Sequence, residues 1–344
     1  HRGCEGRERP PCRIPVTAQG LTVAKLRRTQ TAFADDASLR LRAAWLYHGH
    51  GMTQNEVAEQ LGIGRTTVIR LLEESRKRGE VRIWIEDGEA DLVQLAIALE
   101  RKLGLDEAIV VPAVGGIEQA ARSVGLALGK FLSETITDNM TIGVGWGRTL
   151  TASLASFHAP AHSGVKVLSL LGGAVETRFA NPVEFSWRLA SALNAECYLF
   201  PAPLVVDSAE TKQRLIQSCG LDKLYAMAEH LDLAVISAGD ISAQSTSLVR
   251  HLISPSEHDE LVALGCVGDV MCHFFDAEGR QVPHPVNDRI MSIGLEAVRK
   301  ADHLVLASGG AIRAKAILAS IRNLGCNTLV TDEAAARHIL ELTK

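Results

Sequence analysis

The chain has 344 residues, 47% of them hydrophobic and 22% charged, which is enough for two domains and a substantial core. It contains no run of about 18 apolar residues, so a conventional membrane-spanning helix is not expected. Residues 1–86 carry 15 Lys and Arg against 10 Asp and Glu, whereas the remainder carries 21 against 30. A basic head on an acidic body predicts a protein that binds nucleic acid at one end only.

The first 35 residues lack the apolar core of a signal peptide, and we interpret residues 1–35 as a disordered or expression-derived leader. Seven cysteines are scattered without a CxxC pair, a pattern typical of reduced thiols in the cytoplasm. Cys266, Cys272, His273 and His284 lie within a short span. Because their spacing fits no common zinc pattern, we expect no metal site.

Residues 54–73 have the pattern of two short helices joined by a tight turn. Thr53 is a suitable N-cap, and Glu56 three residues later completes a capping box. Gly62 stands at the end of the first helix, where a left-handed residue is usually required. Ala58 is small enough to let two helices cross closely. The segment therefore predicts a helix-turn-helix.

The second of these helices presents polar residues once its apolar positions are assigned to the core. Arg65, Thr66, Thr67 and Arg70 remain outward, and they suit the phosphates and base edges of a DNA major groove. Gly64 takes the N-cap position, where serine is more typical but glycine is tolerated. An ordinary helical hairpin is the alternative, and the outward basic residues favour DNA binding over it.

The flanking segments extend this module. Residues 39–47 predict a helix that packs under the helix-turn-helix, and residues 81–85 alternate as a short strand does. We therefore predict a winged helix-turn-helix over residues 36–87, in which Arg82 is either a DNA backbone contact or a solvated arginine. Residues 88–106 predict a linker or oligomerisation helix, with packing against its own domain as the alternative.

From about residue 107 the sequence pattern changes, and short apolar runs alternate with segments that have the periodicity of amphipathic helices. The predicted strands are 108–112, 141–144, 165–171, 233–237 and 303–307, and the predicted helices are 117–134, 183–194, 208–219 and 311–323. This alternation predicts an α/β domain over residues 107–344, with a Rossmann-like, mostly parallel sheet covered on both faces. Ligands of such sheets bind beyond the carboxyl ends of the strands.

Glycine-rich loops follow three of the predicted strands at that end. The first loop leads into a helix whose N-terminal amides favour an anion. Its Arg148 and Thr149 can add a positive charge and a hydroxyl. Its spacing is not the GxGxxG of dinucleotide binders, so no nicotinamide cofactor is expected. Each loop taken alone also has a structural explanation, since strand-to-helix turns use glycine for geometry. The candidate residues of the three loops are Gly145, Trp146, Gly147, Arg148 and Thr149, then Gly172 and Gly173, then Gly309 and Gly310 with Lys315.

Two further segments are unusually polar for a core. Residues 265–270 present Asp269, and residues 285–289 present Asn287 and Arg289. Carboxylates and amides bind the vicinal hydroxyls of sugars, so these side chains are candidates for the same ligand. A pair of structural turns is the alternative, because Asp and Asn are good turn formers.

The helix-turn-helix and the motifs that follow it resemble one family. In order they are Gly-Trp-Gly-Arg-Thr, Leu-Leu-Gly-Gly, Pro-Ala-Pro-Leu-Val-Val, Gly-Cys-Val-Gly-Asp, Ser-Gly-Gly with Lys315, and Leu-Val-Thr-Asp-Glu. This series is similar to that of the SorC family of bacterial sugar-responsive transcriptional regulators, over roughly residues 38–344.

The resemblance implies an N-terminal winged helix-turn-helix and a C-terminal effector domain similar to glucosamine-6-phosphate isomerases, ribose-5-phosphate isomerases and CoA transferases. It also implies a homotetramer and an effector that is a phosphorylated sugar or a polyol. By resemblance, the phosphate-loop role falls on residues 145–149, while Lys315 and Asp269 take ligand-contacting positions and Asn287 and Arg289 are assigned to the same site.

A sugar-phosphate isomerase or deaminase with a DNA-binding head is the alternative, because such enzymes share the fold. An enzyme of that kind needs a positioned acid/base pair, and no compact motif brings a carboxylate together with His or Lys. We therefore expect a DNA-binding regulator without catalytic residues or cofactors. Its expected partners are a double-stranded DNA operator, a sugar phosphate or polyol, and further copies of the chain, with no membrane association.

Overall fold

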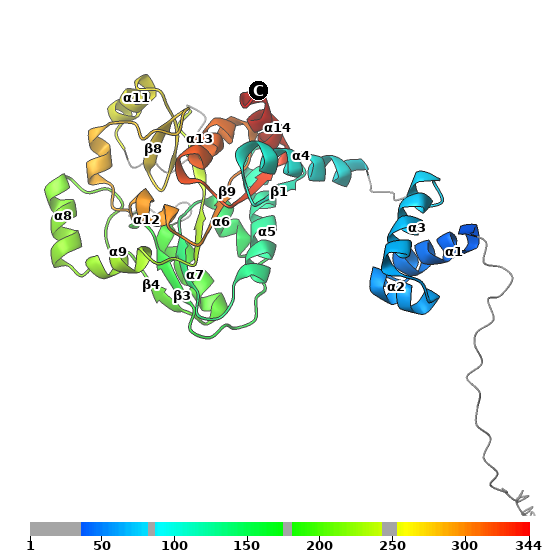
Figure 1. Ribbon diagram of the computed structural model, residues 1–344. Helices are drawn as coiled ribbons and strands as arrows, with labels where there is room; N and C mark the ends of the chain where they lie inside the picture. The colour runs from blue at the N-terminus through cyan, green and yellow to red at the C-terminus, as the bar shows by residue number, and fades with distance from the viewer. Residues whose placement is uncertain (1–35, 82–86, 175–180, 243–252) are drawn as a thin grey trace, which may run out of the picture. The chain divides into compact units, whose positions relative to one another are not determined.

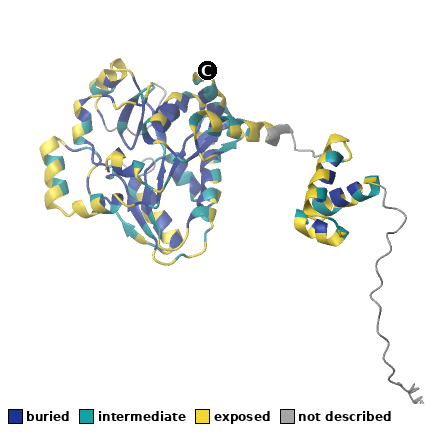
Figure 2. Ribbon diagram, in the orientation of Figure 1, coloured by how far each residue is buried: buried dark blue, intermediate teal, exposed yellow. Residues whose placement is uncertain are grey.

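The computed structural model describes residues 36–81, 87–174, 181–242 and 253–344. The chain divides into two compact units, His1–Trp84 and Ile85–Lys344, and each has its own buried core (Figures 1 and 2). The predicted leader at residues 1–35 lies outside the described residues. So do Arg82 and nearly all of the strand predicted at 81–85.

The described part of the first unit is helical. It contains α1 (Asp36–Ala44), a π-helical turn η1 (Trp45–Gly49), α2 (Gln54–Leu61) and α3 (Arg65–Lys77). Ala43, Val57, Val68 and Leu71 are fully buried, so α1, α2 and α3 all contribute to one small core. The predicted helix-turn-helix is present as α2 and α3.

Caps and one ion pair define the ends of these helices. The Thr53 hydroxyl accepts from the Glu56 amide at 3.3 Å, while the Glu56 carboxylate accepts from the Thr53 amide at 2.7 Å. Gly62 ends α2 with φ 68°, the left-handed geometry that its position required. Buried Arg40 donates to both carboxylate oxygens of Glu80, at 2.7 and 2.6 Å, and so ties α1 to the chain beyond α3.

The second unit is built around a parallel sheet. Its strands are β1 (Glu107–Val111), β2 (Thr141–Val144), β3 (Lys166–Ser169), β4 (Glu196–Tyr198), β5 (Leu233–Ile236), β9 (His303–Ala307) and β10 (Thr328–Asp332). They lie in the order β1-β10-β9-β5-β2-β3-β4, all parallel. The predicted fold class is confirmed, although β4 and β10 were not among the predicted strands.

Helices cover both faces of this sheet (Figure 1). The described helices of this unit are α4 (Asp87–Leu103), α5 (Ile117–Thr135), α6 (Arg148–Ser153), α7 (Pro182–Leu193), α8 (Ala209–Ser218), α9 (Asp222–Ala228), α11 (Pro255–Ala263), α12 (Leu295–Arg299), α13 (Ala314–Leu324) and α14 (Glu333–Leu342). Residues of α5 and α7 join one core cluster and residues of α4, α13 and α14 join the other. Neighbouring residues of β5 alternate between the two clusters, as a strand buried on both faces requires.

A small antiparallel sheet lies beyond β5. It consists of β6 (Ala238–Asp240), β7 (Cys266–Val270) and β8 (His273–Asp276). The polar segment at 265–270 is therefore mainly a buried strand and not a turn. The segment at 285–289 is a 3-10 turn, η2 (Pro285–Arg289), and a second 3-10 turn, η3 (Ala311–Arg313), precedes α13 where one continuous helix was predicted.

Helix α4 packs against its own unit along one face. Leu99 is fully buried in the core, and Leu95 and Leu103 pack partly buried against it. Val93 and Ile97, four residues apart on another face, are 55% and 40% exposed. Packing against its own domain, the alternative considered for this helix, thus accounts for the buried face of α4. Its exposed face is free to contact a partner.

Two glycines of α5 let α6 approach closely. A Cβ on Gly125 would lie 2.6 Å from the Thr149 carbonyl oxygen, and a Cβ on Gly129 would lie 2.2 Å from the Ser153 carbonyl oxygen. No atom fits at such separations without a shift of the backbone. These glycines therefore determine where α6, and with it Arg148, is placed.

We expect Gly129→Ala to destabilise the second unit by about 1–3 kcal/mol, because overpacking forces the two helices apart. The measurement is urea unfolding followed by circular dichroism. Lys130→Ala, at the adjacent exposed position, is the control and should stay within about 0.5 kcal/mol. Equal stability of Gly129→Ala and Lys130→Ala would show that the close approach is not a constraint.

Candidate effector site and DNA-recognition surface

The predicted recognition residues lie at the start of α3. Arg65 and Thr66 are exposed, Thr67 is half-buried, and no side-chain cap precedes them because the N-cap is Gly64. The first turn of α3 thus presents a guanidinium and hydroxyls to solvent. Such groups can reach both base edges and phosphates.

Arg70 differs from Arg65 because it is already paired. Its Nη1 donates to Glu74 at 2.9 Å, and its Nη2 lies 3.6 Å from Asp36, although the side chain is 52% exposed. Sequence spacing alone shows the Glu74 pair, since the two residues are four apart on a helix. Arg70 must release these carboxylates before it can contact a base.

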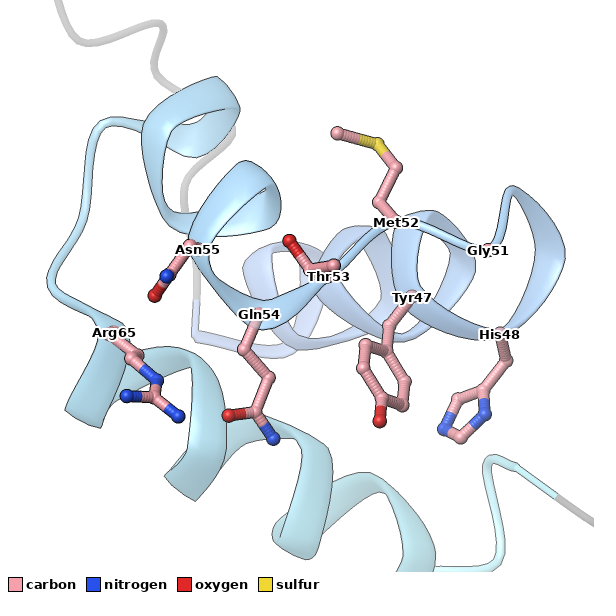
Figure 3. A pocket seen from close by; sticks show the side chains of 8 residues that line it. All are labelled: Tyr47, His48, Gly51, Met52, Thr53, Gln54, Asn55 and Arg65. Atoms are coloured by element: carbon pink, nitrogen blue, oxygen red, sulfur yellow. The ribbon is translucent and has the colours of Figure 1, made fainter. Parts of the chain in front are cut away.

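A pocket of about 600 Å³ opens beside Arg65 (Figure 3). Eight residues line it: Tyr47, His48, Gly51, Met52, Thr53, Gln54, Asn55 and Arg65. They come from η1, from the turn after it, and from the first turns of α2 and α3. Sequence analysis identified only Arg65 of this group.

In the second unit, charged side chains gather at the carboxyl ends of three adjacent strands. Arg148 follows β2 and Asp240 ends β6, which continues directly from β5. Arg313 follows β9, and Asp269 lies on β7, where it pairs with Gly239 of β6. The chain leaves β2 and β5 in opposite directions across the sheet, and this reversal is where open α/β sheets bind ligands.

The cluster is held by one buried ion pair. Arg313 Nε lies 3.4 Å from Asp240 Oδ1, and the two side chains are only 8% and 3% exposed. Ser242 Oγ donates to the other Asp240 oxygen at 2.6 Å. Gly268, beside Asp269, has no room for a Cβ, which would lie 2.4 Å from Ala316 of α13. The second sheet is thereby pressed against the helix that follows Arg313.

Arg148 is incompletely satisfied. Its Nη1 lies 3.6 Å from Glu118 on α5, and its buried Nη2 has no hydrogen-bond partner among the described residues. Burial lowers the pKa of Arg148, and the nearby positive charge of Arg313 lowers it further. Two guanidiniums close enough to repel each other form a site that an anion would stabilise.

Asp269 is the most perturbed carboxyl of the cluster. Burial raises the pKa of Asp269 to about 7, and the negative charge of Asp240 acts in the same direction. The Cys272 amide, which donates to Asp269 at 3.0 Å, and the charge of Arg313 oppose this shift. A carboxyl that titrates near neutrality is typical of functional sites.

The glycines of the predicted loops have structural roles in this state. Gly172 and Gly173 donate their amides to the carbonyls of Met291 and Ala202, at 2.8 and 2.9 Å, and a Cβ on Gly172 would lie 2.5 Å from the Ala202 carbonyl oxygen. The Gly145 amide donates to Val235 at 2.9 Å. Contact of these glycines with a ligand remains a prediction.

The loop after β9 is similarly braced. The Gly310 amide donates to Asp332 at 3.0 Å, and a Cβ on Gly309 would lie 2.8 Å from Val124. Lys315 lies exposed in the first turn of α13, whereas Arg313 two residues earlier is buried in the cluster. Trp146 and Thr149 are buried, and Gly147, with φ 131°, turns the chain into α6.

Asn287 and Arg289 lie in η2, and their side chains contact residues outside the charged cluster. Arg289 pairs with Glu257 of α11. Asn287 donates to the Val282 carbonyl at 2.8 Å, and its buried Oδ1 has no partner among the described residues. Their assignment to the effector site remains a prediction.

The cysteines and histidines considered as a metal site have separate partners. His284 bonds to Glu260, and His273 bonds to Ser292 and to the Ile293 carbonyl. Burial raises the pKa of the Cys266 thiol to about 12 and that of Cys272 well above its usual range. In the described ranges, no three His, Cys, Asp or Glu side chains are grouped as metal ligands would be.

Sequence reasoning missed Asp240 and Arg313. Both follow predicted strands, β5 and β9, at the end where ligands bind, so their position was a usable signal. Their pairing was not, because 73 residues separate them and only the strand order β9-β5-β2 brings them together.

Comparison with known proteins agrees with this architecture. The family model for a putative sugar-binding domain matches residues 89–341. The erythritol catabolism regulatory protein EryD of Brucella abortus is 30% identical over 90% of this chain and 98% of its own length. The deoxyribonucleoside regulator of Bacillus subtilis is 29% identical over 88% of this chain and 97% of its own length.

A solved structure covers both units. The full-length sorbitol operon regulator SorC from Klebsiella pneumoniae has a TM-score of 0.67 and 26% identity, over 89% of this chain and 100% of that one. The chain belongs to the SorC family of sugar-binding transcriptional regulators. It is a regulator and not an enzyme, in agreement with the relatives, which are named as regulators. None of the described helices of this SorC family member has the length and apolar character needed to cross a membrane.

The raised pKa of Asp269 makes stability depend on pH. Its folded-state pKa of about 7 lies above the ordinary 3.8, so between these pH values the folded protein binds a proton that the unfolded chain does not. The free energy of unfolding therefore falls as the pH rises from about 4 to 7. Asp269→Asn keeps an oxygen for the Cys272 amide and removes the charge. We expect it to be about 2–4 kcal/mol more stable than the parent at pH 8 and to match it at pH 4.

Urea unfolding at pH 4, 6 and 8 measures this difference. The exposed Asp259→Asn is the control and should track the parent at every pH. A parallel pH profile for Asp269→Asn and the parent would contradict the assigned pKa.

Proposed function

We propose that this protein binds an operator through α3 and that a small ligand, a sugar phosphate or a sugar alcohol, switches its operator affinity. The charged cluster of Arg148, Asp240, Asp269 and Arg313 carries the proposal. The relatives support it, since their names refer to erythritol catabolism, the sorbitol operon and deoxyribonucleosides. As a DNA-binding regulator it would act in the cytoplasm.

The chemistry of the cluster favours a phosphorylated ligand slightly over a neutral polyol. Arg148 has an unused buried N–H group and lies near a second guanidinium, so a phosphate would relieve the mutual repulsion. Asp240 and Asp269 would repel a phosphate placed on them, but they suit hydroxyl groups. A consistent arrangement puts the phosphate on the arginines, within reach of the 145–149 loop, and the hydroxyls on the carboxylates.

We also propose a homo-oligomer, a tetramer by family resemblance, which presents paired α3 helices to two half-sites. One small helix-turn-helix buries too little surface for tight operator binding. The exposed Val93 and Ile97 on α4 offer an apolar contact for a second copy. The ligand must prefer one arrangement of subunits, because equal affinity for both would shift nothing.

The effector can be identified by a thermal-shift screen of sugars, polyols and their phosphates, since a ligand at about 100 times its Kd adds about 2.7 kcal/mol to the free energy of unfolding.

Arg148→Gln should abolish the response of DNA binding to the effector and leave effector-free DNA affinity intact. We expect Lys315→Ala to behave likewise if Lys315 turns towards the ligand. Arg337→Ala, an exposed arginine of α14, is the control.

A full response by both Arg148→Gln and Lys315→Ala at the parent's effector concentration would place the site elsewhere. Sedimentation velocity with and without effector tests the oligomer in the same samples. A monomer at micromolar concentration, with and without operator, would exclude the proposed assembly.

For DNA, we expect Arg65→Ala and Arg70→Ala to weaken operator binding. If Arg70 reads a guanine, its loss costs about 1–3 kcal/mol and relaxes preference at one base pair. Lys77→Ala removes the same charge from the other end of α3 and serves as the control. Fluorescence anisotropy with an operator selected from random duplexes measures all three. Unchanged binding by both arginine variants would remove α3 from the interface.

A further inference from the structure

The pocket beside Arg65 has a composition that suits an anion. The described side chains that line it include no carboxylate. Arg65 supplies a positive charge, and Tyr47, His48 and Gln54 supply further hydrogen-bonding groups. Glu56, on the same turn of α2, accepts from the amide and hydroxyl of Thr53 at 2.7 and 2.9 Å.

The donor groups lie on one side of this part of the fold. Figure 3 shows the side chains of Tyr47, His48, Gln54 and Arg65 extending to one side of the ribbon, whereas Met52 points away. Arg65 begins α3 and Gln54 begins α2, while the two rings come from η1. Four groups from three segments therefore line the same opening.

The backbone that carries the rings is held by its own hydrogen bonds. The His50 amide donates to the Trp45 carbonyl and the Met52 amide to the Leu46 carbonyl, both at 3.2 Å. The Tyr47 and His48 rings meet edge to face with centroids 4.9 Å apart. The segment that carries the two rings is thus held in place by contacts within the protein.

We propose that Tyr47, His48, Gln54 and Arg65 contact the phosphate backbone of the DNA and so set the register of α3 in the groove. This inference rests on the proposed DNA binding. It adds a contact surface outside the recognition helix. Inorganic phosphate has the same chemistry, but a pocket open to solvent and continuous with the first turn of α3 favours a phosphate of the duplex that α3 reads. Such contacts orient a protein without reading sequence.

The test uses the full chain and two duplexes, a selected operator and a random sequence. Tyr47→Phe removes only a hydroxyl, and Gln54→Ala removes an amide. Each is expected to weaken binding about 3- to 10-fold, and by the same factor on both duplexes, because a phosphate contact is independent of sequence. Gln60→Ala, an exposed glutamine of α2 outside the pocket, is the matched control and should bind as the parent does.

Salt dependence separates the charged from the neutral contacts. Arg65→Ala should reduce the slope of log K against log salt by about 0.9, whereas Tyr47→Phe and Gln54→Ala should leave the slope unchanged. Unaltered thermal unfolding of each variant shows that folding is not the cause.

Parent-like binding by Tyr47→Phe and Gln54→Ala would overturn the proposal while leaving DNA binding by the chain intact. A loss confined to the operator would also overturn it, because the groups would then be reading bases. Stabilisation of the parent by inorganic phosphate, with no effect of the variants on DNA affinity, would assign the pocket to a free anion instead. If the parent binds neither duplex, the proposed function and this inference fail together.

Discussion

The buried Arg313–Asp240 pair is the interaction on which the proposed effector site depends. Buried charges are costly unless they are compensated, so loss of either partner would leave the other with much less compensation. Arg148 and Asp269 extend the pair into a set of two cations and two carboxyls. With Asp269 titrating near neutrality, a bound ligand changes the balance of charges in the whole set, not at one residue alone.

The fold places that set by packing constraints far from the charges. Gly125 and Gly129 let α6 lie close against α5, and Gly268 lets β7 lie close against α13. A ligand that moved Arg148 would therefore act on α5, because Arg148 Nη1 lies 3.6 Å from the Glu118 carboxylate of that helix. Packed helices shift between discrete arrangements, and such shifts can carry a signal from a site to a subunit contact.

The DNA-binding unit uses few residues for several tasks. Its helices share one small apolar core, and buried Arg40 supplements this core with an ion pair to Glu80 at its edge. The two arginines of α3 that are predicted to contact DNA differ in their surroundings. Arg70 is restrained by Glu74 and Asp36, whereas Arg65 has no ion-pair partner among the described residues and borders the donor-lined pocket. The two arginines predicted to contact DNA thus differ in the free protein, because Arg70 is held in ion pairs that DNA contact would have to replace.

Local chemistry was sufficient for part of this description. The Thr53–Glu56 capping box and the left-handed Gly62 depend on near neighbours, and the short apolar runs that alternate with amphipathic helices are visible in the sequence, so the sequence alone predicted the helix-turn-helix and the parallel α/β sheet. It also selected Arg148 and Asp269. The pairing of Asp240 with Arg313, the hydrogen bonds of the Gly172 amide to the Met291 carbonyl and of the Gly310 amide to the Asp332 carboxylate, and the placement of Tyr47 and Arg65 at one pocket depend on residues distant in the chain. Only the strand order and the helix crossings bring those groups together, because periodicity gives the face on which a residue lies and not the element that it meets.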